Sequence, residues 1–540
     1  MRFIAVLIVS ISIFSFAPMP VLAEDIDQAA LLQKIDNLTK ELESLKQQVQ
    51  ELKKKDEQKE EKKLAAEQVP VAPVGKAAGA KPKPSPFSFS GDYRFRYDYL
   101  AGRVGDHFNL EDVLASKLGG PAPQLQKGFN AENSSLLMNR LGLNFKVQAT
   151  QDIALKTRFL MYKVWGHDTA GPVTGGNGFF FDRMNIFDGN VSHVPEDSIL
   201  RVDQAYIHWA HPLGLSNVAF SVGRRPSTGG VPGNLRENQI RRGTSGVTGL
   251  LVDYAFDGLT LSYKPLIKTL PGSFVKLCAG RGFESGFRDV NNGLKDSNMA
   301  GINITGYSTD NFRAEFQYAR AFDIYAFPET STSNIFGKNK NLGDMDELAA
   351  VVMGKRRDIG PGDLNLFLSG GMNISHPNGN VIEVPVHDTF TGTTVDEPVA
   401  GLLYDAGGSR ESRTGYAVYL GERYDFKPTL TKVGLEYNHG SKYWTPFIPA
   451  ADDIWTGKLG ARGNVYEVYL IQELKQKPIT KFGKAYFRLG YQYYDFDFTG
   501  TNDWVGEPKG MSSLNNPANA QIFAPVKSAQ DAYLTLDVEF

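Results

Sequence analysis

The segment Asp531-Ala-Tyr-Leu-Thr-Leu-Asp-Val-Glu-Phe540 alternates between apolar and polar side chains without a break. One face carries Ala532, Leu534, Leu536, Val538 and Phe540, and the other carries Tyr533, Thr535, Asp537 and Glu539. A period of two is typical of a β-strand that lies between two different environments. Such a final strand suits a closed transmembrane barrel, in which it pairs with the first strand and leaves no open edge. We therefore expect Phe540 to be the barrel-closing terminus.

The first residues, 1–23, have the features of a secretory signal peptide. Arg2 precedes an apolar run from Phe3 to Phe16, and Val21-Leu-Ala23 is a small-residue cleavage site before Glu24. The run is shorter than the roughly 20 residues that span a bilayer. No later segment has an apolar run of that length, so we expect the mature protein to cross a membrane with strands.

The composition agrees with a barrel and argues against other classes. The chain has 540 residues with 55 Gly, 34 Phe, 23 Tyr, a single Cys and a net charge of -2. One cysteine excludes a disulfide within the chain, and no Cys/His spacing indicates a metal site or a haem attachment. The near-neutral charge gives no reason to expect nucleic acid. We predict no metal, no cofactor and no nucleic-acid partner.

Residues 24–63 contain a heptad pattern that predicts a periplasmic coiled coil. Its core positions are Leu31, Ile35, Leu38, Leu42, Leu45, Val49 and Leu52. β-branched residues at a with Leu at d favour dimers, whereas an outer-membrane setting favours trimers, so the oligomer number stays open. The alternative is an amphipathic helix packed on a globular core. The coiled coil would offer contacts to the cell wall or to a periplasmic protein.

A Pro/Ala/Lys-rich linker at 64–86 separates this helix from a barrel at 87–540. From Phe87 to Tyr99 the period changes to two, with aromatic residues on one face and charged residues on the other. This alternation is the lipid-out, water-in pattern of barrel strands.

The same alternation recurs along the chain and predicts an all-β, antiparallel up-and-down barrel of 16 strands. The further segments are 140–148, 153–161, 201–210, 216–225, 248–256, 273–281, 298–307, 311–321, 346–354, 363–375, 413–424, 429–439, 463–475, 483–495 and 530–540. Leu259, Leu261 and Tyr263 also alternate, and 376–412 is long enough to hide a hairpin, so 18 strands is the alternative. Short links interleave with long ones, which is typical of periplasmic turns and extracellular loops.

The terminal Phe540 on an alternating strand and the rhythm of short and long links resemble the bacterial outer-membrane porins. Asp203-Gln-Ala-Tyr-Ile-His-Trp209, followed by Phe220-Ser-Val-Gly-Arg-Arg-Pro226, resembles the paired strands that lead into the third loop of substrate-selective porins. The coiled coil before the barrel is similar to an uncharacterised porin-like family of metal-respiring bacteria. The resemblance implies a Gram-negative outer-membrane location and contact with its lipid.

For a pore, the candidate residues are those that face the lumen. Strand parity predicts the pore-lining residues Arg94, Arg96, Arg140, Lys146, Lys156, Arg158, Arg225, Glu467, Glu473, Asp537 and Glu539. The basic members come from the first strands and the acidic ones from the last, which predicts one basic wall and an acidic region at the closure. Charge on a confined aqueous path sets ion preference, and here it favours anions.

The third long loop carries a second candidate set. Arg236, Glu237, Arg241 and Arg242 lie between Gly-rich segments, and the resemblance implies that they fold into the lumen as a constriction. Guanidinium groups placed there would attract anions. The alternative is a loop that faces solvent outside.

The remaining groups of His, acidic and Cys residues give little indication of a functional site. His208 and His211 point to opposite faces of a strand and cannot share a metal. Asp344, Asp346 and Glu347 read as a solvated acidic loop, and Cys278 as a small packing residue in a strand.

The function that we expect is passive diffusion of small hydrophilic solutes or ions, with no enzymatic activity. The alternative is structural: a sheath around a periplasmic electron-transfer partner, or an envelope tether.

Overall fold

The computed structural model describes residues 86–169, 179–180, 194–226, 230–239, 250–252, 255–287, 293–327, 338–448, 452–475 and 483–540. The predicted signal peptide, the coiled-coil core at Leu31 to Leu52 and, apart from Pro86, the linker lie outside these residues. Arg241 and Arg242 also lie outside them.

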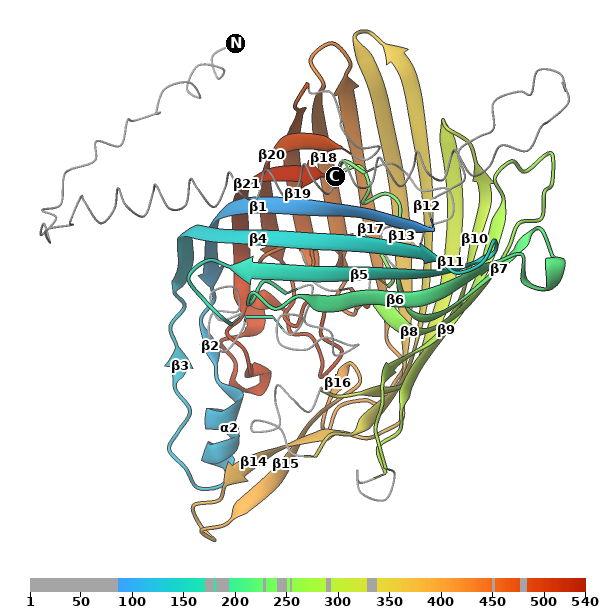
Figure 1. Cartoon of the computed structure of the whole chain (residues 1–540). Helices are drawn as coiled ribbons and strands as arrows, with labels where there is room; N and C mark the ends of the chain where they lie inside the picture. Colours follow the sequence, from blue (N-terminus) through green and yellow to red (C-terminus); the bar gives the residue numbers. More distant parts are fainter. Residues whose placement is uncertain are drawn as a thin grey trace, which may run out of the picture. The chain divides into compact units, whose positions relative to one another are not determined.

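Sixteen antiparallel strands form one closed barrel (Figure 1). The strands are β1 (Phe87–Val104), β4 (Asn130–Gln148), β5 (Ile153–Val164), β6 (Arg201–Ala210), β7 (Val218–Pro226), β8 (Ala255–Tyr263), β9 (Phe274–Phe283), β10 (Ser297–Ser308), β11 (Phe312–Tyr325), β12 (Asn341–Ile359), β13 (Gly362–Pro377), β17 (Thr414–Phe426), β18 (Thr431–Gly440), β19 (Gly463–Glu473), β20 (Lys484–Phe496) and β21 (Val526–Glu539). Each strand pairs with its sequence neighbour in the barrel, and β1 pairs with β21. The predicted up-and-down barrel of 16 strands is confirmed.

One sequence prediction about the strands is wrong, and the alternative of 18 strands does not hold. The strand expected at 248–256 is β8 at Ala255–Tyr263, so the alternation of Leu259, Leu261 and Tyr263 was the true signal. The segment 376–412 does contain strands, namely β14 (Ile382–His387), β15 (Thr394–Gly401) and β16 (Tyr404–Asp405). These strands form a separate small sheet, so they do not raise the barrel to 18 strands.

The links between barrel strands alternate strictly in length. Short turns occupy 149–152, 211–217, 264–273, 309–311, 360–361, 427–430 and 474–483. The loops at the opposite end are L1 (105–129), L2 (165–200), L3 (227–254), L4 (284–296), L5 (326–340), L6 (378–413), L7 (441–462) and L8 (497–525). We refer to the two ends of the barrel as the short-turn end and the long-loop end.

The pairing of β1 with β21 closes the barrel through backbone bonds and one aromatic contact. Gly91 and Phe540 exchange two hydrogen bonds, N to O, of 2.8 and 3.0 Å. A Cβ on Gly91 would lie 2.5 Å from Cζ of Phe540, so the glycine provides the room in which the ring packs. The ring also lies 5.9 Å from that of Phe89.

L1 and L6 build a layer beyond the strands at the long-loop end (Figure 1). L1 holds the short pair β2 (His107–Phe108) and β3 (Leu125–Gln126) and the helix α2 (Leu110–Lys117). Asn109 caps α2, because its side chain accepts a hydrogen bond of 2.8 Å from the Glu111 N–H. Thr389 of L6 donates its backbone N–H to the Leu118 carbonyl at 3.0 Å, which ties the two loops together.

Apolar side chains of the long loops fill much of the barrel interior near the long-loop end. Trp444 and Phe447 of L7, Leu403 of L6 and Trp504 of L8 are buried in one apolar cluster. The Trp504 indole donates to the Tyr325 carbonyl at 2.8 Å, which satisfies its polar atom. The core therefore lies inside the barrel and not outside it.

Large apolar side chains are exposed on the outward face of most of the barrel strands. Leu368 is 51% exposed, Leu435 49% and Leu489 56%. Bands of exposed large apolar residues of this extent are foreign to water-soluble monomers. Among the described residues, no helix is long and apolar enough to cross a membrane.

Candidate functional site

Residues 230–239 of L3 lie inside the barrel and are held there by inward side chains of two strands. Arg423 of β17 donates to the Leu235 carbonyl at 2.6 Å, and Tyr486 of β20 donates to the Glu237 carbonyl at 3.1 Å. Alternation within each strand points these side chains inward, because their sequence neighbours face outward. L3 is therefore anchored to the barrel wall through its backbone.

Glu237 joins L3 to two arginines on opposite sides of the closure. Its carboxylate accepts from Arg94 of β1 at 2.9 Å and from Arg488 of β20 at 3.0 Å. Burial by itself would raise the pKa of the Glu237 carboxyl, but Arg488 and Arg94 together lower it below its usual range. Glu237 is thus held in its ionised form.

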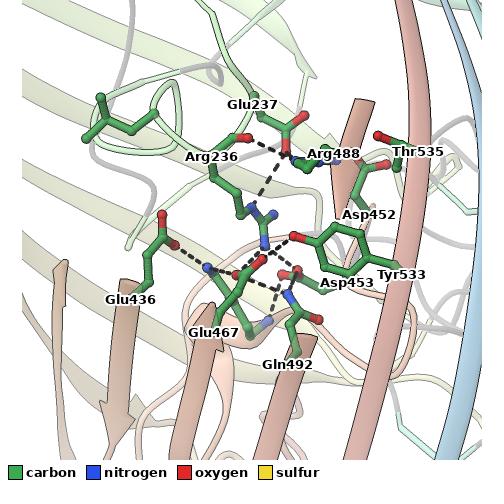
Figure 2. Close-up of polar contacts among 12 residues, drawn as sticks. Arg236, Glu237, Glu436, Asp452, Asp453, Glu467, Arg488, Gln492, Tyr533 and Thr535 are labelled. Carbon is green, nitrogen blue, oxygen red and sulfur yellow. Dashed lines mark hydrogen bonds and ion pairs between the residues drawn. The ribbon is translucent and has the colours of Figure 1, made fainter. Parts of the chain in front are cut away.

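Arg236, the neighbour of Glu237, points the opposite charge at a second set of acids. Figure 2 shows its guanidinium aimed at Glu467 of β19 and at Asp453 of L7. The distances are 3.3 Å to Glu467 and 2.6 Å to Asp453. Arg236 and Glu237, two adjacent residues of L3, therefore make ion pairs both with the barrel wall and with L7.

L7 also folds inward and supplies both signs of charge. Asp452 pairs with Arg94, and it accepts from Arg140 at 3.1 Å. Lys458 pairs with Glu436 of β18 and donates to Glu467 at 2.5 Å. Burial opposes ionisation of Asp452, yet Arg140 and Arg94 hold its pKa well below the usual range.

We name this set of ion-paired side chains the luminal clasp. Its members are Arg94, Arg140, Arg236, Glu237, Glu436, Asp452, Asp453, Lys458, Glu467, Arg488 and Asp537. Removal of one partner from such a buried pair costs about 3–5 kcal/mol, because it leaves a charge without compensation. The clasp therefore fixes L3 and L7 in the lumen.

The other side of L3 is apolar. Val231 and Leu235 are buried in the same cluster as Met353 of β12, Phe367 of β13 and Tyr419 of β17. L3 thus has apolar side chains in the buried apolar cluster on one side and ion-paired side chains on the other.

Between L3 and the short-turn end lies a cavity of about 1340 Å³. Eight of the predicted pore-lining residues line it: Arg94, Arg140, Lys146, Lys156, Arg158, Glu473, Asp537 and Glu539. Arg236 and Glu237 of L3 and Asp452 and Asp453 of L7 lie at its inner end. A charged, water-accessible space of this kind suits hydrophilic solutes.

Three other predicted residues face inward but do not line the cavity. Arg96 is 1% exposed and pairs with Asp98 at 2.6 Å. Arg225 is 6% exposed and lies 3.8 Å from the sulfur of Cys278. Glu467 is buried within the luminal clasp.

The basic and acidic residues of the lumen lie together, because β1 and β21 are neighbours. Arg94 donates to Asp537 at 2.5 Å across the closure. Arg158 pairs with Asp92 at 2.8 Å. The guanidinium groups expected to form a basic wall are thus largely neutralised by carboxylates beside them.

Sequence reasoning missed several members of the clasp for two different reasons. Glu436 and Arg488 lie on segments that the sequence marks as strands, so strand parity alone would have assigned them to the lumen. Asp452, Asp453 and Lys458 belong to a loop, where no periodicity tells which way a side chain points.

The acidic group at Asp344, Asp346 and Glu347 is not a loop, because all three residues lie on β12. Asp344 and Asp346 face outward and pair with Arg320 at 2.9 and 3.2 Å, whereas Glu347 is buried. Among the described residues, no group of three or more His, Cys, Asp or Glu side chains is placed to hold a metal ion.

Solved structures with some likeness to this chain include several outer-membrane proteins. A loop-deletion mutant of OmpT, an outer membrane protein of Vibrio cholerae, has a TM-score of 0.37 at 12% identity over 84% of this chain and 100% of that chain. Pseudomonas putida OprB has a TM-score of 0.38 at 12% identity over 84% and 94%. The outer membrane channel DcaP of Acinetobacter baumannii has a TM-score of 0.37 at 11% identity over 84% and 97%.

A search of curated proteins finds no match. A family model described as "Protein of unknown function (DUF3373)" matches residues 130–540. The match includes every barrel strand except β1, and both loops that carry the luminal clasp. This chain belongs to that family.

Proposed function

We propose that the protein is a channel of the Gram-negative outer membrane through which small hydrophilic solutes or inorganic ions diffuse passively. The observation that carries the proposal is the closed barrel itself, which is apolar outside and encloses a charged cavity of about 1340 Å³. A closed sheet satisfies every backbone group of its strands, as the hydrocarbon core requires.

The alternation of link lengths supports an orientation for the barrel. In outer-membrane barrels the short turns face the periplasm and the long loops face outside. The short-turn end, with Gly91 and Phe540, is then periplasmic, and the charged cavity opens on that side. The segment at 24–63 would lie in the periplasm, where its heptads support a homo-oligomer, for which we favour a trimer.

Within the cavity, Lys146 is the basis for a preference for anions. It is exposed in the lining, and no carboxylate of the described residues lies within 4 Å of its ammonium group. Lys156, opposite Lys146 on β5, lines the same cavity. Two ammonium groups in a confined path raise the local concentration of anions.

Recordings from the purified full-length protein in a planar bilayer test this proposal. We expect stepwise open-channel currents and a zero-current potential in a KCl gradient that reports anion preference. The preference should weaken as salt rises, since the Debye length falls from about 10 Å at 0.1 M to about 3 Å at 1 M. A barrel that stays silent under all voltages would contradict the channel.

The preference is tested by a double variant, Lys146→Gln with Lys156→Gln, which should shift the potential towards cations. The matched control is Lys264→Gln with Lys268→Gln, which removes the same charge from an exposed short turn. An equal shift in both variants, or none in the first, would show that the two cavity lysines do not set selectivity.

A further inference from the structure

The outward face of the barrel carries a groove of about 690 Å³. Its apolar lining comes from seven neighbouring strands and includes Val352, Leu366, Leu420, Leu435, Val468 and Tyr491. A volume of this size lies in the range of binding sites for small molecules, 300–1,000 Å³ by rough survey.

One carboxylate lies in this apolar surface. Glu422 faces outward on β17, opposite Leu366 of β13 and Leu435 of β18, and its side chain is exposed. No basic side chain of the described residues lies within 4 Å of it. A charged group on the lipid face is destabilising unless something neutralises it or brings it to the interface.

A basic residue, Arg356, lies on β12 two positions beyond Gly354, the last residue of that strand to line the groove. In the register of the sheet, Arg356 of β12 lies opposite Leu364 of β13, and Leu364 lies opposite Tyr424 of β17. Tyr424 is two residues from Glu422, on the side of the short-turn end. The Arg356 side chain is exposed, and no carboxylate of the described residues lies within 4 Å of it. Gly354, two residues away on the same strand, lines the groove, and a Cβ there would have no atom within 4 Å.

The pairing register sets the separation of the two charges. Arg356 and Glu422 are two strands apart and offset by two residues, which places their Cα atoms about 12 Å apart from standard strand spacing and rise. Both side chains are long enough to bring their charged ends within several ångströms of each other. A ligand that carries a negative and a positive group a short distance apart would contact both.

We propose that the groove binds a phospholipid with a primary ammonium headgroup, such as phosphatidylethanolamine, in the periplasmic leaflet. Arg356 contacts the phosphate, Glu422 contacts the ammonium, and the acyl chains lie along the apolar lining. The inference rests on the proposed membrane location. A headgroup without an ammonium, as in phosphatidylglycerol, leaves Glu422 without a partner.

Native mass spectrometry of the full-length protein tests the site. The protein in detergent is mixed with equal amounts of phosphatidylethanolamine and phosphatidylglycerol, and the bound lipid of each kind is counted per chain. We expect wild type to favour phosphatidylethanolamine about three- to fivefold, because an exposed ion pair contributes up to about 1 kcal/mol. Glu422→Gln should bring this ratio to about one, and Arg356→Gln should lower retention of both lipids.

The matched control is Asp152→Asn, which removes an exposed carboxylate from a short turn elsewhere on the barrel and should keep the wild-type ratio. Equal retention of both lipids by wild type, or an unchanged ratio in Glu422→Gln, would overturn the inference. Disulfide-linked dimers of a Leu368→Cys variant would also overturn it, because a second copy would then occupy the groove. Channel recordings of the same samples show separately whether the proposed function holds.

Discussion

At the scale of single residues, glycines decide where aromatic rings can pack on the barrel wall. A Cβ on Gly91 would lie 2.5 Å from the ring of Phe540, and one on Gly490 would lie 2.2 Å from the ring of Tyr533. Because neither glycine has a side chain, a ring on the neighbouring strand can occupy the space in each case. The first contact lies outside the barrel and the second inside it.

Gly91→Val should weaken the closure between β1 and β21. The added side chain meets the Phe540 ring on one side and the Gly142 carbonyl, 2.9 Å from a Cβ, on the other. Overpacking of this kind costs about 1–3 kcal/mol. We expect the temperature at which the folded form converts to the unfolded form on a semi-native gel to fall in the variant.

The control is Gly306→Val on β10, where a Cβ would have no atom within 4 Å. An equal fall in both variants would mean that any valine in place of a strand glycine weakens the barrel. The closure would then have no special sensitivity.

At the scale of elements, L3 is attached by apolar burial on one side and by ion pairs on the other. Apolar contacts of Val231 and Leu235 do not depend on pH, whereas the ion pairs of Arg236 and Glu237 do. Acid should therefore release the ionic side first. For the ion pairs that Glu237 makes with Arg94 and Arg488, the pKa of the Glu237 carboxyl sets the pH at which they are lost.

Because Arg94 and Arg488 lower the pKa of Glu237, its ion pairs contribute fully above the ordinary carboxyl pKa of about 4.3 and are lost only as pH falls through the lowered value. We expect the single-channel conductance to stay constant from pH 7 to about pH 4 and to change only below that. Glu237→Gln should already have the altered conductance at pH 7 and should lack this acid transition. A wild-type transition at or above pH 5 would contradict the assignment.

The sequence predicts the strands and the loops of this protein with unequal success. The barrel strands can be predicted because each has one face in an apolar environment and one in a polar environment. Apolar and polar side chains therefore alternate along the sequence of each strand. Near β8 the rule failed: the segment 248–256 looked like a strand, although Leu259 to Tyr263 was the part with the true alternation. The inward path of L7 had no such signal, because Asp452 and Lys458 reach their partners only through tertiary packing.

At the scale of the whole molecule, the closed sheet should resist dissociation as a unit. Every barrel strand has two neighbours, so no strand can leave without breaking two ladders. We expect the protein to stay in the membrane fraction after salt or carbonate washing and to change its gel mobility only after boiling. Release by carbonate alone would contradict a membrane-spanning barrel.

The partner of β1 on one side is β4, and on the other it is β21, which lies far along the chain: Arg94 and Asp537 are 443 residues apart. While β21 is still missing from a growing or unfolded chain, β1 has an unpaired edge that any exposed strand can join. Bringing such distant segments together is also slow, because loop closure precedes the contacts that reward it. The chain must therefore be kept apart from its copies on the way to the membrane, and aggregation is the expected fate of any form that lacks β21.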